Sequence, residues 1–108
     1  NYYVPHGIAV NIGMIFANIL SFERKLISEN DMKLVNENIL LPNIYLKLRE
    51  MDFNNKILLK SMKNDKKRIG NFLTVIIPDK DFRMIKVDDV TDMEFDSVMN
   101  TLKIICLK

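Results

Sequence analysis

The sequence predicts a mainly α-helical domain that contains one small β-hairpin. Two observations lead to this fold class. Apolar residues recur at helical spacing over most of residues 7–62 and again after residue 91. Between these stretches lie two short runs rich in β-branched residues, separated by a polar turn. The chain has 108 residues, the length of one small domain, so we expect residues 1–108 to form a single helical domain.

The first predicted helix covers about residues 7–27. Its apolar residues are three or four positions apart, which places them on one wide face and predicts deep burial. Pro5 precedes this pattern, so His6 should lie at or near the N-terminus of the helix. The apolar positions are Ile8, Ile12, Ile15, Ile19, Phe22 and Leu26.

Further helices are predicted before residue 63. Ser28 is a suitable N-cap for a helix that runs towards Leu40. Pro42 then either kinks the chain or starts a new helix over residues 43–50. A short helix over residues 56–62 follows a polar break.

The predicted hairpin follows a polar, basic stretch. Residues 72–77 form one expected strand, which Pro78 closes, and residues 82–87 form the other. The polar turn between them is residues 79–81.

The last predicted helix begins with a capping box in which Thr91 and Glu94 are three residues apart. Its apolar face consists of Phe95, Val98, Leu102 and Ile105.

Composition and charge argue against several classes of protein. The net charge is only +2 and the basic residues are scattered, so we expect no nucleic-acid partner. The longest apolar stretch, residues 8–22, is interrupted by Asn11 and Asn18 and is too short to span a bilayer, so we expect no membrane partner. A lone cysteine, Cys106, fits a reducing, cytoplasmic location. Because the chain begins at Asn1 without a methionine, we expect a fragment of something longer.

Spacing alone identifies no catalytic or metal site. There is one histidine, so the chain holds no His/His or His/Cys cluster. The glycines at 7, 13 and 70 are too far apart for a phosphate-binding loop. These patterns predict no more than a small helical domain with a basic turn.

Two segments do resemble a known family. Residues 6–14 read His-Gly-Ile-Ala-Val-Asn-Ile-Gly-Met, which resembles the His-Gly-x-Ala-Val-x-Ile-Gly-Met segment of the 3-dehydroquinate synthase, or sugar phosphate cyclase, superfamily. Residues 62–67 read Met-Lys-Asn-Asp-Lys-Lys and resemble that family's Asp-Lys-Lys turn, with Gly70 and a strand after it. The resemblance covers essentially the whole chain and implies the latter part of the family's helical C-terminal domain.

The resemblance implies that His6 is a ligand of a catalytic zinc. A neutral imidazole suits zinc, and a catalytic zinc needs three protein ligands and one open position. The family's other ligands, a glutamate and a second histidine, would precede Asn1. The alternative is that His6 is a capping or surface histidine.

The resemblance also assigns binding of the substrate phosphate to a lysine, either Lys66 or Lys67. An ammonium group is a suitable point charge for a phosphate dianion, and Arg68 would add to the local field. The alternative is a solvated basic loop, and charge alone does not choose between the two lysines.

By resemblance, the parent protein is a cytoplasmic two-domain enzyme whose N-terminal NAD-binding domain is absent from this chain. It would be a homodimeric 3-dehydroquinate synthase, a phosphate-eliminating lyase of the shikimate pathway and aromatic amino acid biosynthesis. NAD and zinc or cobalt would serve the cyclisation of a seven-carbon ketoacid sugar phosphate, and the isolated fragment would be inactive.

Two alternatives remain open. Many family members carry an acidic residue where this chain has Ile8, which leaves room for another cyclase, such as a 2-deoxy-scyllo-inosose or valiolone synthase type that forms a cyclitol. The other alternative is a non-catalytic helical interaction domain.

Overall fold

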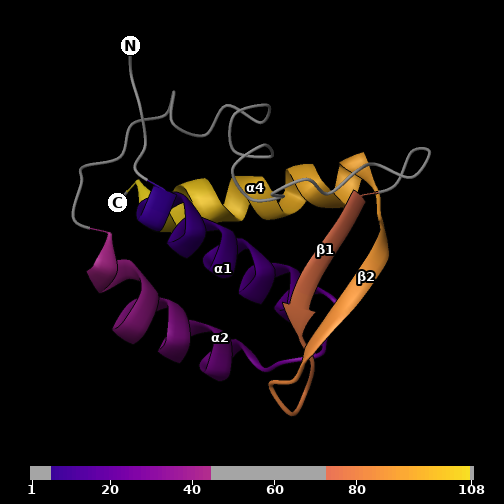
Figure 1. Cartoon of the computed structure of the whole chain (residues 1–108), viewed down its shortest axis with the longest axis horizontal. Helices are drawn as coiled ribbons and strands as arrows, with labels where there is room; N and C mark the ends of the chain where they lie inside the picture. Colours follow the sequence, from indigo (N-terminus) through magenta and orange to yellow (C-terminus); the bar gives the residue numbers. More distant parts are fainter. Residues whose placement is uncertain (1–5, 45–72, 108) are drawn as a thin grey trace.

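The computed structural model describes residues 6–44 and 73–107, apart from the side chains of His6 and Ala9 (Figure 1). The described part is mainly helical with one two-stranded antiparallel hairpin, as the sequence predicts. In chain order, the elements are α1 (His6–Glu23), α2 (Glu29–Val35), the π-helical turn η1 (Asn36–Leu40), the 3-10 turn η2 (Leu41–Asn43), β1 (Leu73–Pro78), β2 (Met84–Val90) and α4 (Asp92–Cys106).

The core is built around α1. This helix packs against α2 with η1, against α4 and against β1, so it lies between the other elements in Figure 1. Phe16 of α1 meets Phe95 of α4 with ring centroids 5.1 Å apart, in a tilted arrangement that aromatic pairs favour. The predicted inward face of α1 is confirmed, because four isoleucines on it are buried. They are Ile8, Ile12, Ile15 and Ile19.

The prediction that α1 continues to residue 27 is wrong. The helix ends at Glu23, because Lys25 adopts a left-handed conformation with φ of 64°. The backbone N–H of Leu26 donates to Ser21 O and that of Lys25 donates to Phe22 O, each at 2.9 Å. These two bonds form a Schellman motif, which more often has glycine at the left-handed position. Leu26 therefore lies beyond the helix, half-buried against the core.

The second helix begins as predicted, and the π-helical turn η1 follows α2 directly. Ser28 Oγ accepts from the backbone N–H of Asp31 at 3.1 Å, which confirms the N-cap. Met32, Asn36 and Leu40 are all buried at intervals of four residues, a spacing that drifts by about 40° per step around an ideal α-helix. In η1 the N–H of Leu41 donates to Asn36 O, five residues back, and this wider turn offsets the drift.

The prediction for Pro42 is settled only in part. Pro42 lies within η2, and Ile44 has an extended conformation, so no helix begins at Asn43 as predicted. The rest of the helix expected over residues 43–50, and the helix expected over 56–62, lie outside the described residues.

The hairpin forms, but both strands lie later than predicted. Strands β1 and β2 pair in register from Pro78 opposite Met84 to Val75 opposite Val87, with a bulge before Leu73 meets Val90. Phe82, expected in the second strand, is in the turn with φ of 59°.

A single side chain shapes this turn. Asp79 Oδ1 accepts from the backbone N–H groups of Asp81 and Arg83, at 2.9 Å each. This side-chain acceptor holds the chain in the turn for two residues longer than the apolar pattern indicates.

The helix α4 begins as predicted. Thr91 Oγ1 accepts from the N–H of Glu94 at 3.1 Å. The predicted apolar face is confirmed, with Ile105 half-buried and the other three positions buried. Those three are Phe95, Val98 and Leu102.

Candidate functional site

The first candidate site is the N-terminal end of α1. His6 is the first residue of this helix, which confirms its predicted position in the chain, while its side chain lies outside the described residues. The first turn has no acidic residue, so no side-chain carboxylate there offsets the partial positive charge of the helix terminus. Gly7 is exposed, and a Cβ atom built on it would meet no heavy atom of the described residues within 4 Å. The described residues therefore leave open space beside Gly7.

Ile8, the next residue, faces the core. It is only 1% exposed and belongs to the hydrophobic core. A carboxylate buried at this position would be desolvated at a large cost that only a partner could offset, so isoleucine suits the environment that this chain provides.

The predicted phosphate-binding residues, Lys66 and Lys67, lie outside the described residues. Their assignment, and the choice between them, stays a prediction.

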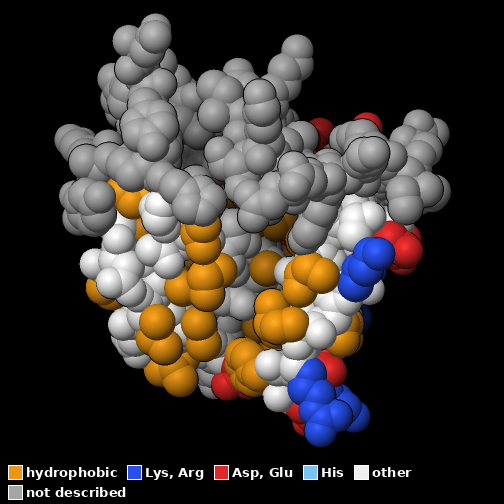
Figure 2. Space-filling model, viewed as in Figure 1, with side chains coloured by type: hydrophobic (Ala, Val, Ile, Leu, Met, Phe, Trp, Pro, Cys, Tyr) orange, Lys and Arg blue, Asp and Glu red, His pale blue; other side chains and the backbone are white. Residues whose placement is uncertain are grey.

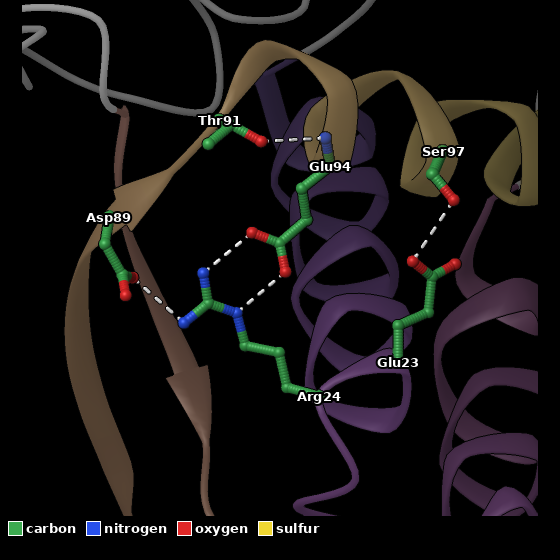
Figure 3. Close-up of polar contacts among 6 residues, drawn as sticks. All are labelled: Glu23, Arg24, Asp89, Thr91, Glu94 and Ser97. Carbon is green, nitrogen blue, oxygen red and sulfur yellow. Dashed lines mark hydrogen bonds and ion pairs between the residues drawn. The ribbon is translucent and has the colours of Figure 1, made fainter.

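The C-terminal end of α1 carries a network of charged side chains that sequence reasoning missed (Figure 3). Arg24 donates from Nε to Glu94 Oε2 at 2.8 Å and from Nη2 to Glu94 Oε1 at 2.7 Å. Its third nitrogen, Nη1, lies 2.9 Å from Asp89 Oδ1. The hydrogen bond to Glu94, followed by that to Asp89, raises the pKa of Arg24 against the opposing effect of burial, so the guanidinium stays charged.

Two more polar contacts tie down the same end of α1. Ser97 Oγ donates to Glu23 Oε1 at 3.3 Å (Figure 3), and Ser21 Oγ donates to Pro78 O at 2.5 Å. Arg24 and Glu94 are 70 residues apart in the chain, and no local motif pairs them. In a complete capping box, Glu94 would instead reach back to its own helix start. This network joins α1 to β1, β2 and α4, and we interpret it as structural.

The other potentially reactive or metal-binding side chains among the described residues do not form a further candidate site. No group of three or more His, Cys, Asp or Glu side chains within residues 6–44 and 73–107 is placed to hold a metal ion. Burial raises the pKa of the Cys106 thiol to about 11, so it is protonated near neutral pH and is a poor nucleophile. No helix in this part of the chain is long and apolar enough to cross a membrane.

The described surface has one shallow feature on α2 and η1. An open hollow of about 380 Å³ lies on α2 and η1 and is lined only by exposed residues of those elements, such as Lys33 and Glu37. Figure 2 shows hydrophobic side chains over much of the face that it presents. The exposed large hydrophobic residues of α1, α2 and η1 are Val10, Met14, Leu34 and Ile39.

A mainly helical domain with one hairpin, whose first helix opens with a His-Gly motif, is the class of protein that fold and sequence define together. Comparison with known families gives the particular assignment. Residues 1–68, more than half of the chain, match the family described as 3-dehydroquinate synthase C-terminal. The chain belongs to this family. No curated protein and no solved structure matches it.

The family match ends before β1, yet the fold continues beyond it. Leu73 and Ile77 of β1 and Val98 of α4 are buried in the same core as α1. The segment after residue 68 therefore covers the inward face of the helix that carries the family motif.

Proposed function

We propose that this chain is the metal- and phosphate-binding C-terminal part of a 3-dehydroquinate synthase. The observation that carries the proposal is the family match over residues 1–68, which includes both motif segments. The reaction would be the cyclisation of a seven-carbon ketoacid sugar phosphate with elimination of phosphate. NAD, bound by a separate N-terminal domain, would supply a transient oxidation of the substrate and the return of the hydride.

The role proposed for His6 is one ligand of a catalytic zinc or cobalt ion. The chemistry of the donor fits, since a neutral imidazole is a common ligand of both metals. The space that the described residues leave beside Gly7 is compatible with a bound group at this helix start. By the family resemblance, the remaining ligands, a glutamate and a second histidine, would come from upstream of Asn1.

The role proposed for Lys66 and Lys67 is to bind the substrate phosphate, with Arg68 beside them. A cation held against the phosphate stabilises the negative charge that builds up on it as it leaves. The homodimer, the cytoplasmic location and the place in the shikimate pathway are parts of the same proposal.

One structural observation favours a related candidate. Ile8 occupies the core position where many 3-dehydroquinate synthases have an acidic residue, so this chain brings no carboxylate next to the His-Gly pair. A cyclitol-forming sugar phosphate cyclase, which would keep the metal and change the substrate, is therefore the second candidate.

Phosphate release by the intact parent protein, with NAD and a divalent metal, tests the proposal. The ketoacid substrate of the shikimate pathway would be compared with glucose 6-phosphate and sedoheptulose 7-phosphate. Release from the first, lowered at least about 100-fold by His6→Ala, is the expected result, because loss of a metal ligand should exceed the effect of losing a group that only orients one. The matched control is Glu23→Ala at the other end of α1, which should keep its activity.

The other outcomes separate the candidates. Release from only one of the other two sugar phosphates would favour the second candidate. No release from any of the three would contradict both, and would leave a non-catalytic interaction domain. The isolated 108-residue chain should release no phosphate from any of them.

A further inference from the structure

A pair of buried amide side chains joins α1 to η1. Asn18 Nδ2 donates to Asn36 Oδ1 at 2.9 Å, and the two side chains come from opposite sides of a helix–helix contact in the core. Asn36 is 1% exposed and Asn18 is 7% exposed. Their neighbours along the helices, including Ile15, Ile19 and Leu40, are hydrophobic and buried. The pair is thus a polar contact within an apolar layer.

The hydrogen bonding of this pair is incomplete. Asn36 Nδ2 is buried and has no hydrogen-bond acceptor among the described residues. Leaving such a donor unpaired costs about 1–3 kcal/mol, so proteins rarely keep one without a compensating partner. The bond between the amides uses the nitrogen of Asn18 and the oxygen of Asn36, and Asn18 Oδ1 is the remaining acceptor of the pair.

The chemistry of the pair specifies the kind of partner. Turning both amides over keeps one bond between them and exchanges the unpaired Nδ2 of Asn36 for an unpaired Oδ1. A partner that can both accept and donate a hydrogen bond therefore fits either arrangement. Water does both, whereas an anion or a cation satisfies only one.

We infer that the Asn18–Asn36 pair binds one internal water molecule, which accepts from Asn36 Nδ2 and donates to Asn18 Oδ1. Two polar partners are the minimum that a buried water usually has. The site lies at the start of the π-helical turn, where regular α-helical spacing is interrupted. The bound water would complete the polar link between the motif-bearing helix and η1.

Nuclear magnetic resonance of the intact protein tests the inference directly. The side-chain amide protons of Asn36 should show a nuclear Overhauser effect to a long-lived water. The variant Asn36→Leu should lose this signal together with the amide. The matched control is Asn38→Leu, which changes an exposed asparagine in the same turn and should keep the Asn36 signal.

A crystal structure of the intact protein gives an independent readout. An ordered water about 2.7–3.2 Å from the unpaired amide atom of Asn36 would support the site. Absence of both the water and the Overhauser effect, with the 2.9 Å bond between the amides intact, would overturn the inference. A protein group in contact with that amide atom would overturn it as well. None of these outcomes bears on phosphate release, so failure here and failure of the proposed enzyme remain distinguishable.

Discussion

The two ends of α1 differ in their polar contacts with the other described elements. At its C-terminal end, Arg24 is held by two carboxylates, and Ser21 and Glu23 bond to β1 and α4. At its N-terminal end, Gly7 meets no side chain of the described residues, and Val10 and Met14 are exposed. The family motif lies at the second, open end. The comparison teaches that a polar network fixes one end of this helix, while the described residues make no such network at its other end.

The largest predicted effect on stability concerns the two faces of α1. Phe16→Ala should lower the free energy of unfolding by about 3–5 kcal/mol, because it removes a fully buried ring that packs on Phe95. Urea denaturation would measure the change. Val10→Ala, on the exposed face of the same helix, should cost less than about 1 kcal/mol. Equal losses for the two variants would contradict the orientation of α1.

The reactivity of the Cys106 thiol measures the packing of α4 near the N-terminal, open end of α1. The contacts of Glu94 and Ser97 with the end of α1 show that α4 runs antiparallel to it, so Cys106 lies towards the beginning of α1 (Figure 1). With a pKa of about 11 in place of 9.0, the thiolate fraction at pH 8 should be about 100-fold lower than in a free cysteine. Iodoacetamide labelling should therefore be slow at pH 8 and accelerate towards pH 11.

The same pKa shift fixes the sign of a pH effect on stability. A raised pKa means that the folded state holds the proton more tightly than the unfolded state does. The stability that the protonated Cys106 thiol contributes is complete below pH 9 and is lost as the pH rises through 11. Labelling at pH 8 as fast as that of the urea-unfolded chain would show that Cys106 is not buried.

The polar network at the C-terminal end of α1, the locked end, should have a smaller effect on stability. Arg24→Met should cost about 1–2 kcal/mol, less than a fully buried pair, because Arg24 and Glu94 are 23% and 24% exposed. A double-mutant cycle with Glu94→Gln would isolate their interaction. The matched control is Lys33→Met, which breaks the exposed pair with Glu29 and should cost no more than about 0.5 kcal/mol. A cycle with no coupling energy would remove the distinction between the locked and the open end.

The smallest predicted effect compares two helix starts. Thr91→Ala and Ser28→Ala each remove a side-chain oxygen that accepts a backbone N–H at 3.1 Å. Each should lower the free energy of unfolding by about 1 kcal/mol, measured by urea denaturation. Thr91 caps the turn of α4 that carries Glu94, the partner of Arg24. The Thr91→Ala variant should therefore also weaken the coupling between Arg24 and Glu94. If only Ser28→Ala were destabilising, the Arg24 network would hold the start of α4 without its cap.

Sequence patterns predicted what depends on near neighbours. The caps at Ser28 and Thr91 and the buried face of α1 each follow from residues within a few turns of one another. The end of α1 could not be predicted, because Lys25 takes a left-handed conformation that favours glycine. Phe82 was placed in a strand because its apolar side chain hides a turn that Asp79 determines.

The candidate site was predicted to a different extent. Pro5 and the apolar periodicity placed His6 at a helix start, which the fold confirms, while its role as a metal ligand stays a prediction. The Arg24 network and the Asn18–Asn36 pair join residues 18 to 70 positions apart, which periodicity does not reveal. Patterns of polarity specify which face of a helix is buried and not which polar partners meet there.

The most direct test of the central claim, that the open end of α1 belongs to a metal centre, is the metal content of the intact protein. After dialysis against zinc and removal of free metal, the wild type should retain about one zinc per chain. His6→Ala should retain far less, and Glu23→Ala at the locked end should match the wild type. Equal zinc in the wild type and in His6→Ala would contradict the account, since His6 would then be a capping or surface residue.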